Sequence, residues 1–180
     1  MDEKQGIDVL EFQVDLIQHL IERADTKASI LLAFLGVILA ISINQDAFLR
    51  ILTTNFLEGS NHPPLLLLIM VCLSFVSFSI SFVFVVLTLR ARLHIEQIGL
   101  TPSIFYFETI SKYEAFDEFK AEYEKITNPK TQLLKEIYNN SKICALKYKY
   151  FNYSLSSLVF GVVLQLCAIV SISLFFKGLP

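Results

Sequence analysis

The sequence lacks the compact motifs that build an enzyme active site. It has no GxSxG nucleophile turn, no phosphate-binding P-loop, no GxGxxG after a strand and no HExxH zinc motif. Its three histidines are isolated, and no group of cysteines and histidines has the spacing of a zinc site. We therefore expect no catalytic residue, no metal site and no cofactor, and we predict that the protein is not an enzyme.

Cysteine is scarce, and the N-terminus does not resemble a signal peptide. Cys72, Cys144 and Cys167 lie in or beside apolar runs without CxxC spacing, so we interpret them as reduced packing residues. A signal peptide has a basic start and an early apolar run, whereas residues 1–22 are rich in Asp and Glu. The net charge of −2 provides no basic field for nucleic acid, which we exclude as a partner.

Charge is absent from three long apolar runs, and these runs set the fold class. Hydrophobic residues make up 54% of the chain, above the roughly 45–50% of soluble domains. A helix of about 20 apolar residues crosses a bilayer core of about 30 Å. We predict an all-α membrane protein with three transmembrane helices, at residues 28–43, 64–89 and 151–176. The first run is short, so flanking residues must extend it or the bilayer must thin locally.

The first span is preceded by an amphipathic segment, residues 1–27, with no Pro or Gly at the junction with the span. We predict one continuous helix that begins in water and ends in lipid. It packs on its own protein or forms a seam between subunits, and the sequence leaves both open. Apolar residues recur at steps of three and four, as in a heptad stripe, at Ile7, Leu10, Val14, Ile17, Ile21, Ala24, Ala28, Leu31, Leu35 and Ile38.

Residues 90–150 are the one sizeable polar segment, and we predict a helical sensing region there. A helix around residues 116–126 is expected to end at Asn128-Pro129, with Thr131 capping the next helix. We predict that this next helix packs on the N-terminal stripe, within or between subunits, and that the protein is a homo-oligomer. Its expected stripe consists of Leu134, Ile137, Ser141, Cys144, Tyr148 and Phe151.

Topology follows from Lys and Arg, which accumulate on the cytoplasmic side of membrane proteins. They are frequent in residues 1–27 and 90–150, whereas the connector 44–63 and the tail 177–180 contain only Arg50 and Lys177. The N-terminus and both helical extensions are therefore predicted to be cytoplasmic. The connector and the tail are predicted to be external.

Polar side chains inside the spans are candidates for a membrane switch. Ser74, Ser77 and Ser81 share one face of the second span, where small residues let helices approach closely. Each serine can instead bond back to its own helix. Gln165 lies within the third span, where an amide bonds to a neighbouring helix or lines a pore.

The cytoplasmic side offers groups that suit a small anion with a flat ring. Cations at the ends of the second and third spans can meet a phosphate, and aromatic rings can stack on a base for about 1–3 kcal/mol. Basic residues at this border are also expected from topology alone. The candidate ligand-binding residues are Asp25, Lys27, Arg90, Arg92, Phe105, Tyr106, Phe107, Asn140, Ser141, Lys142 and Lys147.

Two motifs resemble the Pycsar transmembrane effector family. They are Ala-Asp-Thr-Lys-Ala-Ser at residues 24–29, leading into Leu-Leu-Ala-Phe-Leu-Gly, and Tyr-Asn-Asn-Ser-Lys-Ile-Cys-Ala-Leu-Lys-Tyr at residues 138–148. Residues 102–107 resemble the family's aromatic strip, although Tyr-Phe-Glu stands here where the family often has Phe-Phe-Gly.

The resemblance implies a multi-pass effector of the bacterial inner membrane that acts against phage. A partner cyclase would make cyclic CMP or cyclic UMP after infection, and the effector would respond by impairing the membrane, through a pore or through bilayer thinning. The alternative from the residues alone is a constitutive structural or scaffold membrane protein without a nucleotide response.

Overall fold

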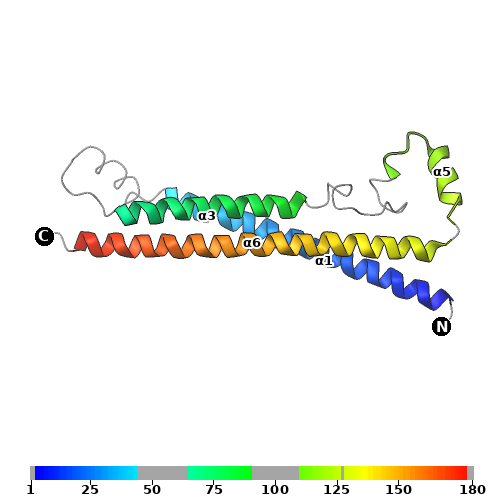
Figure 1. Cartoon of the computed structure of the whole chain (residues 1–180), viewed down its shortest axis with the longest axis horizontal. Coiled ribbons are helices and arrows are strands. Elements are labelled where there is room, and N and C mark those ends of the chain that lie inside the picture. The colour runs from blue at the N-terminus through cyan, green and yellow to red at the C-terminus, as the bar shows by residue number, and fades with distance from the viewer. Residues whose placement is uncertain (1–2, 44–64, 91–109, 127, 178–180) are drawn as a thin grey trace. The chain divides into compact units, whose positions relative to one another are not determined.

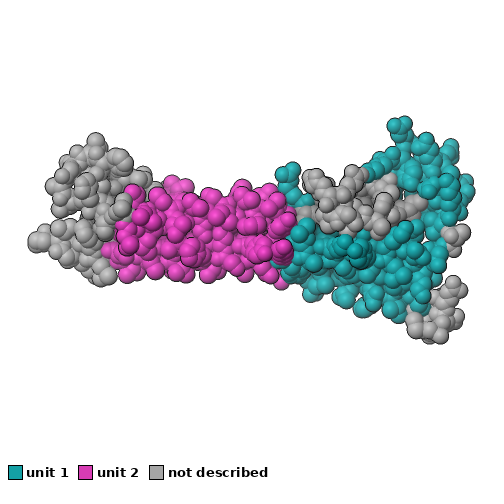
Figure 2. Space-filling model, in the orientation of Figure 1, with its two compact units in different colours: residues 1–26, 90–148 teal, residues 27–89, 149–180 magenta. Residues whose placement is uncertain are grey.

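The computed structural model describes residues 3–43, 65–90, 110–126 and 128–177. Within these ranges the chain is helical and contains no strand (Figure 1). The chain divides into two compact units, which Figure 2 colours separately. Unit 1 comprises residues 1–26 and 90–148, and unit 2 comprises residues 27–89 and 149–180. The helices are α1 (Glu3–Ile43), α3 (Leu65–Arg90), α5 (Phe116–Glu124) and α6 (Pro129–Lys177).

Three of these helices, α1, α3 and α6, are each long and apolar enough to cross a membrane. The predicted class, an all-α protein with three transmembrane helices, is therefore confirmed. Helix α1 continues without a break from the predicted amphipathic segment into the first apolar run, and α6 likewise leads into the third. The predicted connector 44–63 and residues 178–180 of the predicted tail lie outside the described residues.

Unit 2 has polar side chains inside and apolar side chains outside. Six hydroxyl or amide residues of α3 and α6 are buried, whereas large apolar side chains on all three helices are exposed, including Phe34, Val83 and Phe160. Soluble proteins have the opposite arrangement. Lipid tails solvate apolar side chains, so this polarity suits a bundle whose outer surface faces a bilayer. These six residues are Ser74, Ser77, Ser81, Thr88, Ser154 and Gln165.

The buried serines join α3 to α6 in reciprocal pairs. The Ser81 hydroxyl donates to the Ser154 carbonyl oxygen at 2.9 Å, and the Ser154 hydroxyl donates to the Ser81 carbonyl oxygen at 2.8 Å. Ser77 and Ser157 exchange the same two bonds at 2.7 and 2.9 Å. As residue numbers fall along α3 they rise along α6, so these two helices run antiparallel.

An apolar core accompanies these pairs in unit 2. Leu35 of α1, Phe78 and Val85 of α3 and Leu158 of α6 belong to one buried cluster. Gly161 of α6 packs tightly against α3, because a Cβ atom there would be 2.7 Å from Cε1 of Phe78 and 3.3 Å from the Ser74 carbonyl oxygen. The helices therefore need a residue without a side chain at this position.

In unit 1, α1 packs against α6. Ile21 of α1 and Ile143 and Cys144 of α6 form a buried cluster, which the partly buried Ile17 and Tyr148 cover. The prediction that the N-terminal stripe packs on the stripe of residues 131–150 is confirmed within a single chain. Seven of the ten predicted stripe residues of α1 are buried, and Ile7, Ile17 and Ile38 are partly buried; the seven are Leu10, Val14, Ile21, Ala24, Ala28, Leu31 and Leu35.

Two local predictions for α6 are wrong. Its buried face contains Asn140, Ile143 and Lys147, whereas the predicted Leu134 and Ser141 are exposed, because the helix is rotated to bring a polar edge onto α1. The helix is capped by Asn128 and not by Thr131. The Thr131 backbone N–H donates to Oδ1 of Asn128 at 3.3 Å, and Pro129 occupies the first turn, where its missing N–H costs nothing.

Helix α5 confirms the helix predicted around residues 116–126, but no residue in it is buried. Its aromatic side chains contact one another and Tyr113, which precedes the helix. The ring of Phe119 lies 5.8 Å from that of Tyr113 and 5.9 Å from that of Tyr123.

The close approach at Gly161 yields a matched pair of substitutions. Gly161→Val should destabilise unit 2 by about 1–3 kcal/mol, because the new side chain overlaps the packed ring of Phe78. Gly36→Val is the control, since a Cβ atom on Gly36 would meet nothing within 4 Å. Thermal unfolding of the detergent-purified protein, followed by circular dichroism, measures both. Equal unfolding temperatures for the two variants would contradict the described packing.

Candidate functional site

The most unusual group in unit 1 is a buried lysine. Lys147 of α6 is 0% exposed, and its ammonium donates to Oδ1 of Asp25 on α1, whose side chain is 30% exposed. Moving a charge out of water costs several kcal/mol of desolvation free energy, which a well-placed counter-charge offsets. Asp25 supplies the counter-charge, so α1 and α6 are joined by an ion pair as well as by apolar packing.

The helix pairing explains why Lys147 is inside. Asp25 pairs with Lys147, and one turn earlier Ile21 packs near Ile143 and Cys144. Residue numbers therefore increase in the same direction along both helices, which run parallel. Ala24, the neighbour of Asp25, is buried and small. A lysine can bury its apolar stem along a helix surface while its charged end bonds to a polar partner.

The three other predicted ligand-binding residues of α6 do not share a single face of the helix. Asn140 is buried, two turns from Lys147 on the side that faces α1. Ser141 is exposed. Lys142 is half-buried, with its ammonium 4.4 Å from the centre of the Tyr138 ring, a cation–π contact. Only Asn140 and Lys147 therefore share the face toward Asp25.

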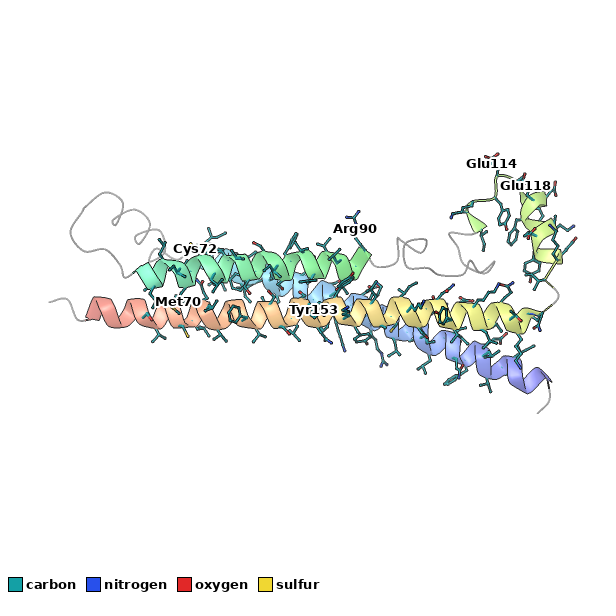
Figure 3. The ribbon with its side chains drawn as sticks, in the orientation of Figure 1. Met70, Cys72, Arg90, Glu114, Glu118 and Tyr153 are labelled. Atoms are coloured by element: carbon teal, nitrogen blue, oxygen red, sulfur yellow. The ribbon has the colours of Figure 1, made fainter. Side chains whose placement is uncertain are left out.

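The remaining predicted ligand-binding residues are more scattered. Lys27 belongs to unit 2, where it is exposed and borders a shallow apolar hollow with Phe34 and Phe151. Arg90, the last residue of α3, is exposed, and Figure 3 shows its side chain extending outward from the helix. Arg92, Phe105, Tyr106 and Phe107 lie outside the described residues.

The predicted membrane-switch residues lie together at the α3–α6 interface of unit 2. Ser74 donates to Oε1 of Gln165 at 2.8 Å, so Gln165 faces protein, as expected. Ser77 and Ser81 bond across to α6, whereas the Ser74 hydroxyl also lies 2.8 Å from the Val71 carbonyl oxygen of its own helix, so it fits both interpretations. Ser79, on the exposed face of α3, bonds back to the Phe75 carbonyl oxygen instead.

Sequence reasoning missed the partners of these serines. Ser154 and Ser157 stand three residues apart in the third apolar run, but they received no role. Their spacing resembles the spacing of Ser77 and Ser81 on the second run, and an antiparallel alignment of the two runs would have matched them. The ion pair of Asp25 with Lys147 was also missed as a pair, although both residues were candidates.

Among the described residues, no group of three or more His, Cys, Asp or Glu could hold a metal ion. The described part of the α1–α6 contact contains a buried cation, its partner carboxylate and, about two turns away on α6, the buried Asn140. These are groups for recognising a small anion.

Comparison with known families decides the identity of the chain. The family model described as the Pycsar effector protein domain matches residues 9–175 of the 180-residue chain. The chain belongs to the Pycsar effector family. The resemblance seen in the sequence is therefore confirmed, and this Pycsar effector is a membrane protein of antiphage defence. No curated protein and no solved structure matches it.

The ion pair predicts an asymmetric response to substitution. Asp25→Asn leaves a fully buried ammonium without its counter-charge, so it should lower the free energy of unfolding by about 2–5 kcal/mol. Lys147→Met should cost much less, because Met fills the apolar seam and the partly exposed Asp25 can be hydrated. The double variant should recover most of the loss of Asp25→Asn. Chemical denaturation in detergent measures all three.

A different pattern would contradict this account of the ion pair. If Asp25→Asn and Lys147→Met are equally destabilising and their effects add in the double variant, the two side chains are not coupled.

Proposed function

We propose that this Pycsar effector responds to a cyclic pyrimidine nucleotide, cyclic CMP or cyclic UMP, by impairing the integrity of the bacterial inner membrane. Membership in the family supports a role in antiphage defence. The three helices of membrane-spanning length support action at a bilayer. In this proposal the N-terminus is cytoplasmic, a partner cyclase makes the nucleotide, and the protein has no enzymatic activity of its own.

The main support for the proposal is that unit 2 buries polar side chains and exposes apolar ones. Its α3–α6 interface is joined by hydroxyl and amide hydrogen bonds between neutral groups. Such bonds inside membranes are worth only about 0.6 kcal/mol on average, so water can replace them at modest cost. When α3 separates from α6, the exposed surface is a polar strip through the membrane. The strip consists of Ser74, Ser77, Ser81, Ser154, Ser157 and Gln165.

The trigger in this proposal is an exchange of anions at Lys147. A cyclic mononucleotide carries one negative charge, as Asp25 does, so its phosphate can take the place of the Asp25 carboxylate on Lys147. Asn140 on the same face of α6 provides an amide for the base or the ribose. Because Lys147 is fully buried, the nucleotide reaches it only when α1 moves away from α6.

This coupling makes nucleotide binding shift a conformational equilibrium. A ligand that binds only the separated state of α1 and α6 increases the population of that state. Helix α6 then continues without a break from Lys147 to Ser154, about two turns further on. In this proposal, a displacement of α6 at the ion pair passes along the continuous helix toward the serine pairs.

We further propose that the effector works as a homo-oligomer. One chain supplies a single polar strip, whereas a water-filled path needs polar groups on all sides. Several copies arranged around an axis would supply those groups.

The two members of the ion pair should have opposite effects on function. In cells that make cyclic CMP or cyclic UMP from a co-expressed cyclase, the native protein should depolarise the membrane. Lys147→Met should abolish the response because it removes the cation that holds the phosphate. Asp25→Asn should depolarise the membrane without a cyclase because it releases α1 from α6. A potential-sensitive dye in whole cells, with an inactive cyclase as control, measures each case.

Control variants separate this mechanism from a general loss of folding. Asp117→Asn removes a carboxylate from the exposed surface of α5 and should behave as the native protein does. If the native protein never depolarises cells that contain the nucleotide, the scaffold interpretation replaces the proposal. If Asp25→Asn and Lys147→Met change the response in the same direction, the ion pair is structural and the nucleotide binds elsewhere.

A further inference from the structure

Helix α1 carries a second apolar stripe on the side away from α6. Val9, Phe12 and Leu16 follow at steps of three and four, so they lie on one helical face, and Phe12 is 68% exposed. Beside them runs an acidic row with a seven-residue spacing, which consists of the exposed residues Asp8, Asp15 and Glu22. We name this surface the acidic stripe.

Helix α6 carries a stripe of matching composition and opposite charge. Leu134 and Tyr138 are exposed and four residues apart, and Tyr138 is 52% exposed. Lys135 and Lys142 flank them at a seven-residue spacing, and both are half-buried. The Lys142 ammonium lies over the Tyr138 ring, which holds the charge beside the apolar patch. We name this surface the basic stripe.

The composition of the acidic stripe selects its partner. Its carboxylates would be repelled by the negative surface of a cytoplasmic leaflet, so a lipid surface does not suit it. A second acidic stripe would bring like charges together. The basic stripe offers apolar side chains and cations together. The α6 of the same chain already packs on the other side of α1, through Ile21 and Ile143, so the fitting partner is the α6 of another copy.

The helix register places the opposite charges at matching heights. Asp25 and Lys147 lie level because they form an ion pair, and α1 and α6 run parallel. Counting back along both helices, Lys135 falls between the levels of Asp8 and Asp15, and Lys142 falls between those of Asp15 and Glu22. Each lysine is then about 3 Å in height from one carboxylate, Asp15 for Lys135 and Glu22 for Lys142, and about 7.5 Å from the next one in the row. Copies related by rotation about the membrane normal keep these heights.

We propose that the acidic stripe of one copy docks on the basic stripe of the next, with the two helices parallel. The apolar side chains then interlock between the copies, and the acidic and basic rows meet along one edge, as charges flank the seam of a parallel coiled coil. The two surfaces differ, so the contact is head-to-tail and generates a ring when the rotation closes. This contact provides the interface for the homo-oligomer proposed above, and it requires no nucleotide.

Site-directed disulfide formation tests the contact. In a background with Cys72, Cys144 and Cys167 replaced by Ser, one chain carries Phe12→Cys and a second, differently tagged chain carries Leu134→Cys. Co-expressed in the same membrane and oxidised without nucleotide, they should form a mixed dimer. Gln13→Cys is the matched control, because Gln13 is also exposed but lies about 100° around the helix. The Phe12→Cys mixed dimer should exceed the Gln13→Cys mixed dimer at least about fivefold.

Charge exchange tests the pairing of the two rows. Asp15→Lys in the Phe12→Cys chain, or Lys142→Glu in the Leu134→Cys chain, should lower the yield of mixed dimer about threefold, because each places like charges together. Both changes combined should restore the yield.

Each remaining outcome overturns the proposal. A Phe12→Cys chain that forms only disulfides with itself would show that two acidic stripes meet. A mixed dimer no more abundant than the Gln13→Cys control would show random collision. Labelling of Phe12→Cys by a lipid-confined thiol reagent would show that the stripe lies on the bilayer. None of these results depends on whether the nucleotide response exists.

Discussion

A lysine ammonium withdrawn from water requires a counter-charge, and in this Pycsar effector Asp25 of α1 provides it for Lys147 of α6. The pair fixes the register of the two parallel helices in unit 1, because a shift of either helix would leave a buried charge alone. That register in turn determines which faces of α1 and α6 remain exposed. In the proposed mechanism, an incoming anion replaces the partly exposed Asp25, so the contact that fixes the structure would also control it.

The apolar helices of unit 2 are held together by a different kind of interaction. In unit 2 the exterior is apolar, and neutral hydroxyl pairs hold α3 to α6 at an interface that Gly161 keeps narrow. Neutral hydrogen bonds hold helices together in lipid without the large penalty of buried charge, and they break at modest cost. In the proposed mechanism, separation of α3 from α6 would expose this polar strip.

The class of fold and the helix faces of α1 could be predicted from the sequence, because charge-free runs and the alternation of three and four follow from single-helix geometry. The buried position of Lys147 could not, because periodicity assigns lysine to the outside unless its partner is known. The serine partners Ser154 and Ser157 depended on the alignment of two helices, and the Asn128 cap was obscured by a second capping residue three positions later. In each case the missing information was which residue lies next to which in the folded chain, and the sequence of a single segment does not contain it.

The central claim is that a cyclic pyrimidine nucleotide separates α1 from α6, and the distance between these helices tests it most directly. Spin labels at the exposed positions Gln18 and Ser141, in a chain without its native cysteines, report this distance by pulsed electron paramagnetic resonance. Dilution with unlabelled chain restricts the signal to single copies. The account predicts that cyclic CMP or cyclic UMP lengthens the main distance by several ångströms. An unchanged distance distribution at a nucleotide concentration that depolarises the membrane would contradict it.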